Sequence, residues 1–504
     1  MRQPDRRSKI VCTLGPKVAD LDSIRKLITA GMDVARLNFS HGSHESHLQN
    51  IQWIREASRE LNIPVAILGD LQGPKIRTGK LLPNQSGEAG WKDIKSGETL
   101  FFRGVDVGMA PQPGNGTREK PITISYPRLS LDLKNGDDVL FDDGLIKMIV
   151  AESFPTENLI ALRVDNGNKL GENKGVNMPT AKLSTLGVTE KDWDDIIFAS
   201  KHNVDFLALS FVRSAREVKS LKQFIDKKKL GIHVIAKIEK GEAVENIDDI
   251  LFWSDGIMVA RGDLGVEIGN EKVPLIQKML IKKARIAGKP VITATQMLMS
   301  MVSSPSPSRA EASDVANAVF DGTDALMLSN ETATGNYPFL SVETMASIIR
   351  GAETVPPADH TVRNLQDYIN EGRKLPVSEA IEAAATALAR GLGAKTLSCL
   401  TRSGQAARQL AKFRPPVPIY AFAENEKVRN QLSLCWGVSV VPWKEMHSMD
   451  HTVFDEMSLE LGRLGLLKDG EHSVMTAGIP TSRQVGTTNT VVVKRYPPPV
   501  ASGA

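Results

Sequence analysis

Cysteine is scarce in this sequence. The 504 residues contain three cysteines, Cys12, Cys399 and Cys435, an odd number at widely separated positions. A disulfide framework needs an even number of cysteines, and a zinc site needs several that are closely spaced. Neither pattern is present, so we expect a reducing environment and a cytoplasmic location.

Long hydrophobic runs are also missing. No apolar stretch approaches the ~18 residues of a membrane span, and the basic N-terminal segment lacks the apolar centre of a signal peptide. The formal charge of +3 is close to neutral for this length, which gives no reason to expect nucleic acid or an anionic membrane as a partner. These absences indicate a soluble globular protein, for which 41% apolar and 24% charged residues are ordinary values.

The sequence does contain an alternation of short apolar segments with longer segments of helical periodicity. Eight segments have the length of β-strands and are almost continuously apolar, as in a parallel sheet covered by helices. They are residues 10–14, 33–39, 65–71, 206–211, 233–239, 256–263, 291–297 and 325–329. Eight strands close a (β/α)8 barrel, the TIM barrel fold, which we prefer to a doubly wound open sheet.

Two regions differ from this alternation. Residues 73–179 contain short strand candidates joined by Asn-Gly and Asp-Gly turns, which predicts a small inserted β-barrel lid domain at the loop end of the barrel. Residues 356–504 contain a long Ala-rich helix (377–392) and five further strand candidates, which predicts a C-terminal α/β domain. The catalytic barrel itself is expected from residues 1–72 and 180–355.

The segment 233–240, HVIAKIEK, is central to the predicted barrel. Lys237 and Glu239 are two residues apart in an otherwise apolar strand, so their side chains share one face of it. Burying two charges is costly unless they are paired or used. This stretch alone is compatible with a structural ion pair and with a pair that carries chemistry.

In such a barrel, active-site groups collect at the carboxyl ends of the strands. Polar residues follow every predicted strand, although each one alone could cap a helix, form a turn or pair locally. They are Thr13, Arg36, Asn38, Ser40, Asp70, Ser210, Lys237, Glu239, Arg261, Asp263, Thr295, Ser329 and Glu331. Their presence at all eight strand ends favours one site around the mouth of the barrel.

These side chains fit phosphoryl transfer. Glu239 and Asp263 are carboxylates on neighbouring strands. Mg²⁺ binds such oxygen ligands and takes water and substrate as its remaining ligands. Arg36 and Lys237 supply positive charge for an anion such as phosphate. Phosphoryl transfer depends mainly on positioning and on neutralising charge. Neither the G-x-x-x-x-G-K-[ST] nor the G-x-G-x-x-G motif is present, so a nucleotide would be held in another way.

Nine segments, in order, resemble signatures of the pyruvate kinase family. They are VCTLGP (11–16), GMDVARLNFSHG (31–42), GDLQGPKIRTG (69–79), NKGVNMP (173–179), VIAKIEK (234–240), MVARGDLGVE (258–267), ATQML (294–298), SRAEASDVANAV (308–319) and SNETATGNYP (329–338). The resemblance covers essentially the whole chain. It implies transfer of the phosphoryl group of phosphoenolpyruvate to ADP, giving pyruvate and ATP, with Mg²⁺ or Mn²⁺ as cofactor. It also implies a homotetramer.

The resemblance implies roles for individual residues as well. Lys237 would stabilise the phosphoryl group in transfer, and Arg36 would hold the phosphate. Glu239 and Asp263 would bind the Mg²⁺. The substrate as a whole would be bound by Arg36, Lys237, Gly262, Asp263 and Thr295. The carbon that is protonated would lie near Thr295, Ser329 and Glu331. The nucleotide, with a second Mg²⁺, would be bound by Pro16, Asn38, His41, Arg77 and Lys174.

A monovalent-cation site is a further feature of the family. Here it would consist of Asn38, Ser40, Asp70 and the Leu71 carbonyl. Members that need K⁺ have Glu where this chain has Lys75, so the chain resembles the branch that does not require K⁺. The Lys75 ammonium could replace the charge of the ion. Thr78, by contrast, resembles the K⁺-requiring members.

The C-terminal region resembles the allosteric domain of the family. Residues 401–413 predict a strand end, a turn and a helix start, whose backbone N–H groups can bind phosphate; a plain strand–helix turn is the alternative. The turn contains Thr401, Arg402, Ser403 and Gly404. The effector would be a sugar phosphate or a nucleoside monophosphate, and residues 478–489 would complete its pocket.

Two other functions fit parts of the sequence. A Mg²⁺-dependent aldolase or lyase acting on oxo acids could use the same carboxylate pair in a similar barrel. It would have no ADP to hold, so the inserted domain and Lys174 argue against it. A catalytically silent metabolite-binding protein is the second alternative, and the complete set of Lys237, Glu239, Asp263 and Thr295 argues against that one.

Overall fold

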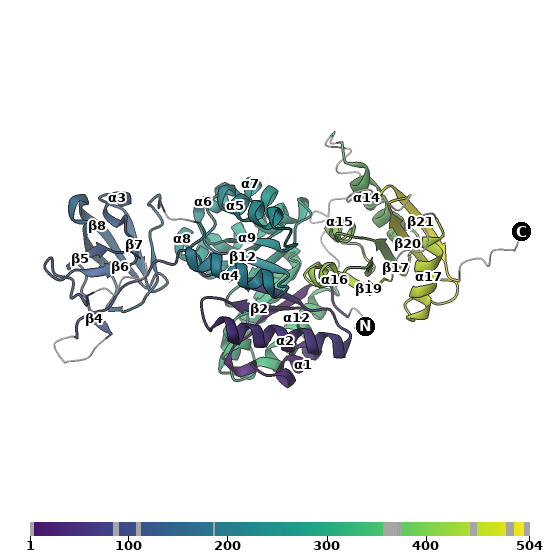
Figure 1. Cartoon of the computed structure of the whole chain (residues 1–504), viewed down its shortest axis with the longest axis horizontal. Coiled ribbons are helices and arrows are strands. Elements are labelled where there is room, and N and C mark those ends of the chain that lie inside the picture. Colours follow the sequence, from purple (N-terminus) through teal and green to yellow (C-terminus); the bar gives the residue numbers. More distant parts are fainter. Residues whose placement is uncertain are drawn as a thin grey trace, which may run out of the picture.

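The computed structural model describes residues 5–83, 90–106, 112–184, 187–355, 370, 372, 374–443, 451–479 and 488–497. Three bodies follow one another along the longest axis of the molecule (Figure 1). A β domain lies at one end, a closed barrel at the centre and an α/β domain at the other end. Among the described helices, none combines the length and the apolar character needed to cross a bilayer.

The central barrel is closed and all of its eight strands are parallel. The strands are β1 (Lys9–Thr13), β2 (Val34–Asn38), β3 (Ala66–Asp70), β12 (Phe206–Leu209), β13 (His233–Ile238), β14 (Gly256–Ala260), β15 (Val291–Ala294) and β16 (Ala325–Leu328). Because β1 pairs with both β2 and β16, the sheet has no open edge. The predicted (β/α)8 barrel is therefore confirmed, and an open sheet is excluded.

Helices surround the barrel. They are α1 (Leu21–Ala30), α2 (His44–Leu61), α4 (Glu190–Lys201), α5 (Ala215–Lys227), α7 (Ile247–Trp253), α9 (Val273–Ile286), α10 (Arg309–Asp321) and α12 (Pro338–Ala352). Their ends follow local chemistry, because Ser43, Thr189 and Ser308 form capping boxes at the starts of α2, α4 and α10. Gly322 ends α10 with φ of +91°, a conformation that glycine adopts without steric cost.

Three expectations about the barrel elements were wrong in detail. Strand β14 stops at Ala260, and residues 261–263 already belong to α8 (Arg261–Ile268). Strand β15 stops at Ala294, because the backbone turns at Thr295 and Gln296 with φ of +70° and +53°. The apolar periodicity of residues 243–254 predicts a single helix, but this region is divided between α6 (Gly241–Glu245) and α7.

The inserted domain is built from short strands. They are β4 (Trp91–Asp93), β5 (Thr99–Gly104), β6 (Ile122–Ile124), β7 (Asp138–Phe141), β8 (Ile146–Phe154), β9 (Leu159–Asn166), β10 (Lys169–Gly171) and β11 (Val176–Asn177), with the short helix α3 (Leu129–Asp132). One sheet has the order β11-β7-β8-β9-β5-β6, and β10 pairs with β4. The pairs are antiparallel as expected, except that β5 and β6 are parallel.

The C-terminal domain has a five-stranded sheet in the order β19-β18-β17-β20-β21. Its elements are α14 (Val377–Gly391), β17 (Thr396–Leu400), α15 (Gln405–Lys412), β18 (Ile419–Ala423), α16 (Glu426–Leu432), β19 (Val438–Pro442), α17 (Val453–Arg463), β20 (His472–Ala477) and β21 (Thr490–Arg495). Strand β21 is antiparallel to β20. Residues 356–369 lie outside the described residues, so the boundary at 355/356 stays a prediction, as do the other two.

The C-terminal domain is docked on the amino-terminal face of the barrel, with α15 and α16 on the side that faces it (Figure 1). Leu434, just after α16, is wholly buried among the inward-facing residues of the barrel strands, such as Val11, Val34 and Leu68. Ser433 Oγ donates to the Pro64 carbonyl at 3.0 Å. A side chain of one domain thus completes the core of the other.

Candidate active site

Lys237 is the centre of the polar groups at the carboxyl ends of the strands. Its ammonium lies 2.8 Å from Ser210 Oγ, 3.0 Å from Glu239 Oε1 and 3.2 Å from Asp70 Oδ1. The side chain is only 13% exposed. Burial acts to lower the pKa of Lys237, but the charges of Asp70 and Glu239 outweigh it and raise the pKa. Lys237 is therefore a permanent cation whose position is fixed by three oxygens.

Asp70, at the end of β3, joins Lys237 to Arg36 on β2. Arg36 Nε and Nη2 both lie 2.7 Å from Asp70 Oδ2, and Arg36 Nη1 donates to Thr13 Oγ1 at 2.9 Å. Burial favours the neutral form of Asp70, yet the charges of Lys237 and Arg36 prevail and hold the pKa of Asp70 below its usual range. The aspartate is thus a fixed anion that orients two cations.

Glu239 and Asp263 are the two carboxylates expected to bind a metal. Glu239 is 1% exposed, and its Oε2 accepts the Phe211 N–H at 2.6 Å. Burial raises the pKa of Glu239; Lys237 opposes this, and the negative charge of Asp263 adds to it. A buried carboxylate destabilised by a second one fits a divalent cation between them. Among the described residues, no cluster of three or more His, Cys, Asp and Glu side chains is arranged to hold a metal ion, but Mg²⁺ is commonly held by only one or two carboxylates.

A cleft of about 510 Å³ lies between the mouth of the barrel and the inserted domain. Residues from both sides line it. The barrel contributes Phe211, Arg213, Lys240 and Asp263, and the inserted domain and its connections contribute Lys75, Asp143, Gly175 and Asn177. Arg213, Lys240 and Asn177 were not among the site residues predicted from the sequence. The available signal was the position of Lys240 directly after Glu239 and of Asn177 in the segment 173–179.

One hydrogen bond joins the inserted domain to α8 of the barrel, and the backbone of the inserted domain comes close to the same helix. Asn177 Nδ2 donates to Glu267 Oε1 at 2.7 Å, and Lys240 Nζ lies 2.5 Å from the same oxygen. At the turn between β7 and β8, a Cβ placed on Gly144 would lie 3.6 Å from Val266. The inserted domain therefore touches the helix that begins with Arg261 and Asp263.

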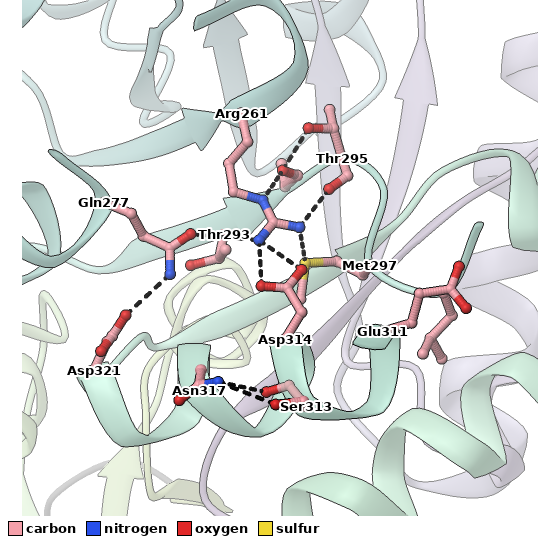
Figure 2. A network of polar contacts seen from close by, with 12 residues as sticks. Arg261, Gln277, Thr293, Thr295, Met297, Glu311, Ser313, Asp314, Asn317 and Asp321 are labelled. Carbon is pink, nitrogen blue, oxygen red and sulfur yellow. Dashed lines mark hydrogen bonds and ion pairs between the residues drawn. The ribbon is translucent and has the colours of Figure 1, made fainter. Parts of the chain in front are cut away.

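Thr295 follows β15 in a left-handed backbone conformation that is uncommon outside glycine. Arg261 supports it (Figure 2), because Arg261 Nη2 donates to the Thr295 carbonyl at 2.7 Å and Arg261 Nη1 lies 2.7 Å from Asp314 on α10. Thr295 Oγ1 accepts the Gly262 N–H at 2.8 Å and donates to the Ala294 carbonyl. Thr295 and Gly262, predicted to bind the same ligand, are in direct contact.

Glu331 is bound to the backbone through both oxygens. Oε1 accepts the Leu298 N–H at 3.1 Å, and Oε2 accepts the Ser329 N–H at 2.8 Å. The carboxylate is almost wholly buried. It therefore joins the segment that follows β15, at Leu298, to the segment that follows β16, at Ser329.

The residues predicted to bind the nucleotide lie on both sides of the cleft region. On the barrel, Pro16 begins the short helix η1 (Pro16–Val18), and Pro16 and His41 are exposed. On the inserted domain, Arg77 Nη1 donates to the Asn173 carbonyl at 2.8 Å, and Lys174 Nζ lies 2.8 Å from Asp142 Oδ1. The structure thus divides this set between two bodies.

At the predicted monovalent-cation site, Asn38 Oδ1 accepts the Ser40 N–H at 3.2 Å, and the Leu71 carbonyl accepts Ser210 Oγ–H at 2.7 Å. Lys75 lines the cleft between the two bodies. Within the described part of the chain its ammonium has no hydrogen-bond or ion-pair partner, and the cations paired with Asp70 are Arg36 and Lys237. Lys75 therefore faces the cleft rather than Asp70 in this structure.

The predicted effector turn connects β17 to α15. Gly404 has φ of +77°, and Arg408 Nη1 donates to the Ser403 carbonyl at 3.3 Å. Thr401 is buried, whereas Arg402 and Ser403 are partly exposed. Most of the loop 478–489 that was expected to complete the pocket, residues 480–487, lies outside the described residues.

A closed parallel barrel with fixed cations and two carboxylates at the carboxyl ends of its strands, beside a cleft under an inserted domain, defines a barrel enzyme. Comparison with models of protein families identifies the kind of barrel enzyme. The pyruvate kinase barrel domain matches residues 5–342, and the pyruvate kinase alpha/beta domain matches residues 379–494. The chain belongs to the pyruvate kinase family.

Individual relatives support the same family assignment. A pyruvate kinase of Geobacillus stearothermophilus is 44% identical over 97% of this chain and 80% of the relative. A pyruvate kinase of Staphylococcus aureus strain MRSA252 is 41% identical over 99% of this chain and 82% of the relative. The crystal structure of a pyruvate kinase from Cryptosporidium parvum superposes with a TM-score of 0.86 at 37% identity, covering 97% of this chain and 96% of that one.

The family decides between the functions considered from the sequence. The protein is a phosphotransferase that acts on phosphoenolpyruvate and ADP and produces pyruvate and ATP. The aldolase and the silent binding protein are not supported. A requirement for a divalent metal ion accompanies this family.

Proposed function

We propose that Lys237 is the group that stabilises the phosphoryl group during its transfer from phosphoenolpyruvate to ADP. The position of the Lys237 ammonium supports this role, because Asp70, Ser210 and Glu239 hold it at the carboxyl ends of three strands. A preorganised cation stabilises the transferring group most strongly when negative charge spreads over that group in the transition state. Arg36, oriented by the same aspartate, would bind the phosphate before transfer.

Glu239 and Asp263 are the proposed ligands of Mg²⁺, or of Mn²⁺. When bound, a divalent ion of this kind neutralises charge on the substrate oxygens. The raised pKa of Glu239, caused by burial and by Asp263, supports a cation at this position. Asp263 lies in the first turn of α8 next to Gly262, so the same segment would also present its backbone to the substrate.

Thr295 and Gly262 would hold the carboxylate end of phosphoenolpyruvate together with Asp263. Their mutual hydrogen bond of 2.8 Å places a hydroxyl and a backbone amide side by side. Protonation of the enolate carbon would occur near Thr295, with the proton delivered by water. Ser329 would lie behind it, and Glu331, whose oxygens are bound to backbone amides, would position this part of the site.

The nucleotide would bind across the cleft. Pro16, Asn38 and His41 would contact it from the barrel, and Arg77 and Lys174 from the inserted domain. Because the two groups belong to different bodies, closure of the inserted domain would complete the nucleotide site, with the second Mg²⁺ arriving on the nucleotide. The hydrogen bond of Asn177 with Glu267 and the closeness of Gly144 to Val266 support such an approach.

The chain would not require K⁺. Lys75 has no ionic partner among the described residues and borders the cleft, so its ammonium is available to move toward Asn38, Ser40 and the Leu71 carbonyl when the cleft closes. The expected result is equal pyruvate formation with and without K⁺ in the wild-type enzyme, and a gain of K⁺ dependence in Lys75→Glu. A K⁺ requirement in the wild-type enzyme would contradict this role.

Regulation and assembly are proposed from the family. The turn formed by Thr401, Arg402, Ser403 and Gly404 would bind a phosphorylated effector, and the active form would be a cytoplasmic homotetramer. The three cysteines are free and buried, which is compatible with a reducing compartment. Effector titrations of the wild-type enzyme and of Ser403→Glu would test the effector site, because only the wild-type saturation curve should shift.

The decisive experiment is pyruvate formation from phosphoenolpyruvate and ADP with Mg²⁺, using Lys237→Met. Removing a charge that acts on the transferring group is expected to lower kcat by about 10²–10³-fold or more. The matched control is Lys240→Met, since Lys240 bonds Glu267 instead of Asp70 and Glu239. A Lys237→Met enzyme as active as the Lys240→Met enzyme would refute the role of Lys237.

A further inference from the structure

The inserted domain is joined to the barrel by two connections. The chain leaves the barrel after β3 and returns to it at α4, and Gly73 and Thr189 lie close to these two points. The two connections are far apart in the sequence. The structure nevertheless brings both of them to one side chain, Asp192 in the first turn of α4.

Asp192 uses a different oxygen for each connection. Its Oδ1 accepts the Gly73 N–H at 3.0 Å, from the connection that leaves the barrel. Its Oδ2 accepts the Thr189 N–H at 2.9 Å and the Thr189 Oγ–H at 2.7 Å, from the connection that returns. Asp192 is wholly buried, so these bonds are shielded from the competition of water.

The bonds to Thr189 belong to a capping box, which alone would only stabilise the start of α4. That role occupies one oxygen of the carboxylate. The other oxygen leaves the helix and reaches Gly73, 119 positions away in the chain. An asparagine at position 192 would present one oxygen and one NH₂ group, so it would accept from only one of the two connections.

Gly73 also lies against residues of the active site. Its φ is +66°, and a Cβ at this position would lie 2.9 Å from the Cβ of Ser210 and 3.0 Å from the ring of Phe211. Ser210 contacts Lys237, and the Phe211 N–H donates to Glu239. The connection that leaves the barrel therefore begins beside the groups proposed to act on the phosphoryl group and to bind the metal.

The first turn of α4 also contacts the barrel half of the proposed nucleotide site. Lys191 Nζ donates to the carbonyl of Phe39 at 2.7 Å, and Phe39 lies in the short segment that carries Asn38 and His41. The same ammonium lies 2.7 Å from Asp195, one turn further along α4. The start of α4 is therefore bound both to the connections of the inserted domain and to the segment expected to contact the nucleotide.

We propose that Asp192 is a positioning residue for the reaction, because it fixes the pivot about which the inserted domain closes on the nucleotide. This inference rests on the proposed division of the nucleotide site between the barrel and the inserted domain. Two connections held by one carboxylate restrict the orientations of the inserted domain, so that Arg77 and Lys174 approach the barrel in one way. With the connections released, a smaller fraction of the protein is competent to bind ADP, and the apparent affinity falls by that fraction.

Asp192 should affect the two substrates unequally, since the residues proposed to bind phosphoenolpyruvate all belong to the barrel. In Asp192→Asn the KM for ADP should rise by about tenfold or more. The KM for phosphoenolpyruvate should change by less than about twofold, and kcat at saturating ADP should be largely kept, because bound nucleotide favours the closed arrangement. A general loss of structure would not separate the two substrates.

Thr189→Val is the matched control. It removes the hydroxyl group from the same capping box, but the Gly73 N–H and the N–H of residue 189 keep their carboxylate oxygens. Both variants should lower the thermal midpoint, because both weaken the cap of α4, but only Asp192→Asn should raise the KM for ADP. An equal rise in the two variants would overturn the proposal, as would equal rises for ADP and phosphoenolpyruvate in Asp192→Asn.

Lys174→Gln separates this proposal from the proposed nucleotide site, because Lys174 is expected to bind ADP from the inserted domain. A raised KM for ADP in Lys174→Gln together with an unchanged one in Asp192→Asn would refute the role of Asp192 and leave the nucleotide site standing. An unchanged KM for ADP in Lys174→Gln would refute the nucleotide site instead, and hydrogen exchange then decides the role of Asp192.

Hydrogen exchange follows the two connections without turnover. Exchange should accelerate at the peptide containing Gly73 or at the one containing residue 189 in Asp192→Asn, and at neither in Thr189→Val. Unchanged exchange at both peptides in Asp192→Asn would overturn the anchoring role, whatever the kinetics show. If Asp192→Asn does not fold, the wild-type protein decides: ADP with Mg²⁺ should slow exchange at both peptides together, and slowing at one alone or at neither would overturn the proposal.

Discussion

Glu382 on α14 shows how one buried carboxyl group can make the stability of the protein depend on pH. Its side chain is 1% exposed, and its Oε2 has no hydrogen-bond partner among the described residues. Burial raises the pKa of Glu382 from the usual 4.5 to about 8, although a hydrogen bond with Thr488 opposes the shift. At neutral pH the folded protein therefore keeps this carboxyl group protonated, whereas the unfolded chain does not.

This difference predicts the sign of the pH dependence. Between pH of about 4.5 and 8 the folded state binds a proton that the unfolded state releases, so the free energy of unfolding falls as the pH rises. Glu382→Gln should remove this contribution and raise stability at pH 8 by on the order of a few kcal/mol. Thermal unfolding at pH 5 and pH 8 measures it. An unchanged pH dependence in Glu382→Gln would refute the assignment.

At the scale of elements, two helices fix the segment that carries Thr295. Arg261 opens α8 and donates to the carbonyl that belongs to Thr295, while Asp314 on α10 holds the guanidinium from the other side (Figure 2). The backbone of Thr295 has a positive φ, which persists only where surrounding contacts enforce it. The arginine and the aspartate are therefore positioning residues for the active site.

Asp314→Asn tests this role. Weakening a charge-assisted contact of Arg261 should let the segment after β15 relax and lower kcat/KM by about tenfold, since such contacts are worth roughly 1.5–3 kcal/mol. The effect should appear in turnover with little change in the thermal midpoint. Asn317→Ala is the control, because Asn317 lies one turn further along α10 and bonds only Ser313 among the described residues. Equal kinetics for the two variants would contradict a positioning role.

The same elements show what could be predicted from the sequence. The apolar periodicity of residues 44–61 and 338–352 predicts two helices. Helices α2 and α12 have these bounds, and a capping box and a proline mark their starts. Lys237, Glu239 and Asp70 could be predicted as site residues because charged residues stand out at the ends of apolar strands.

Other features were not predictable in this way. The positive φ of Phe211 and Thr295 depends on hydrogen bonds from distant elements. Contacts such as Asn177 with Glu267 join parts that no local pattern connects. The position of the Lys75 ammonium likewise depends on how two bodies approach each other.

At the scale of the whole molecule, the barrel depends on the C-terminal domain for part of its own core. Leu434 is wholly buried inside the barrel, and hydrogen bonds from Ser433 and Gln431 hold it to the strand starts. Loss of this side chain leaves a cavity at the amino-terminal face of the barrel. Leu434 is therefore expected to contribute to the stability of the barrel strands as well as to that of its own domain.

Leu434→Ala should cost about 2–5 kcal/mol, as buried large-to-small substitutions do. The informative measurement is hydrogen exchange. In Leu434→Ala, exchange should accelerate in the barrel strands β1–β3 as well as near the mutation. Leu432→Ala removes an equally buried leucine from the core of the C-terminal domain, so its effect should stay in the strands of that domain. Identical exchange patterns in the two variants would show that Leu434 does not couple the domains.

The pairing of β1 with β16 also has a consequence during synthesis of the chain. Lys9 on β1 lies opposite Ala325 on β16, a partner that leaves the ribosome roughly 300 residues later, and contacts of such long range form slowly. Before β12 and β16 are made, β1, β2 and β3 form an apolar sheet fragment with two unpaired edges, the kind of surface on which chaperones act. The strands of the inserted domain pair within a short stretch of sequence, so this domain can fold before the barrel closes.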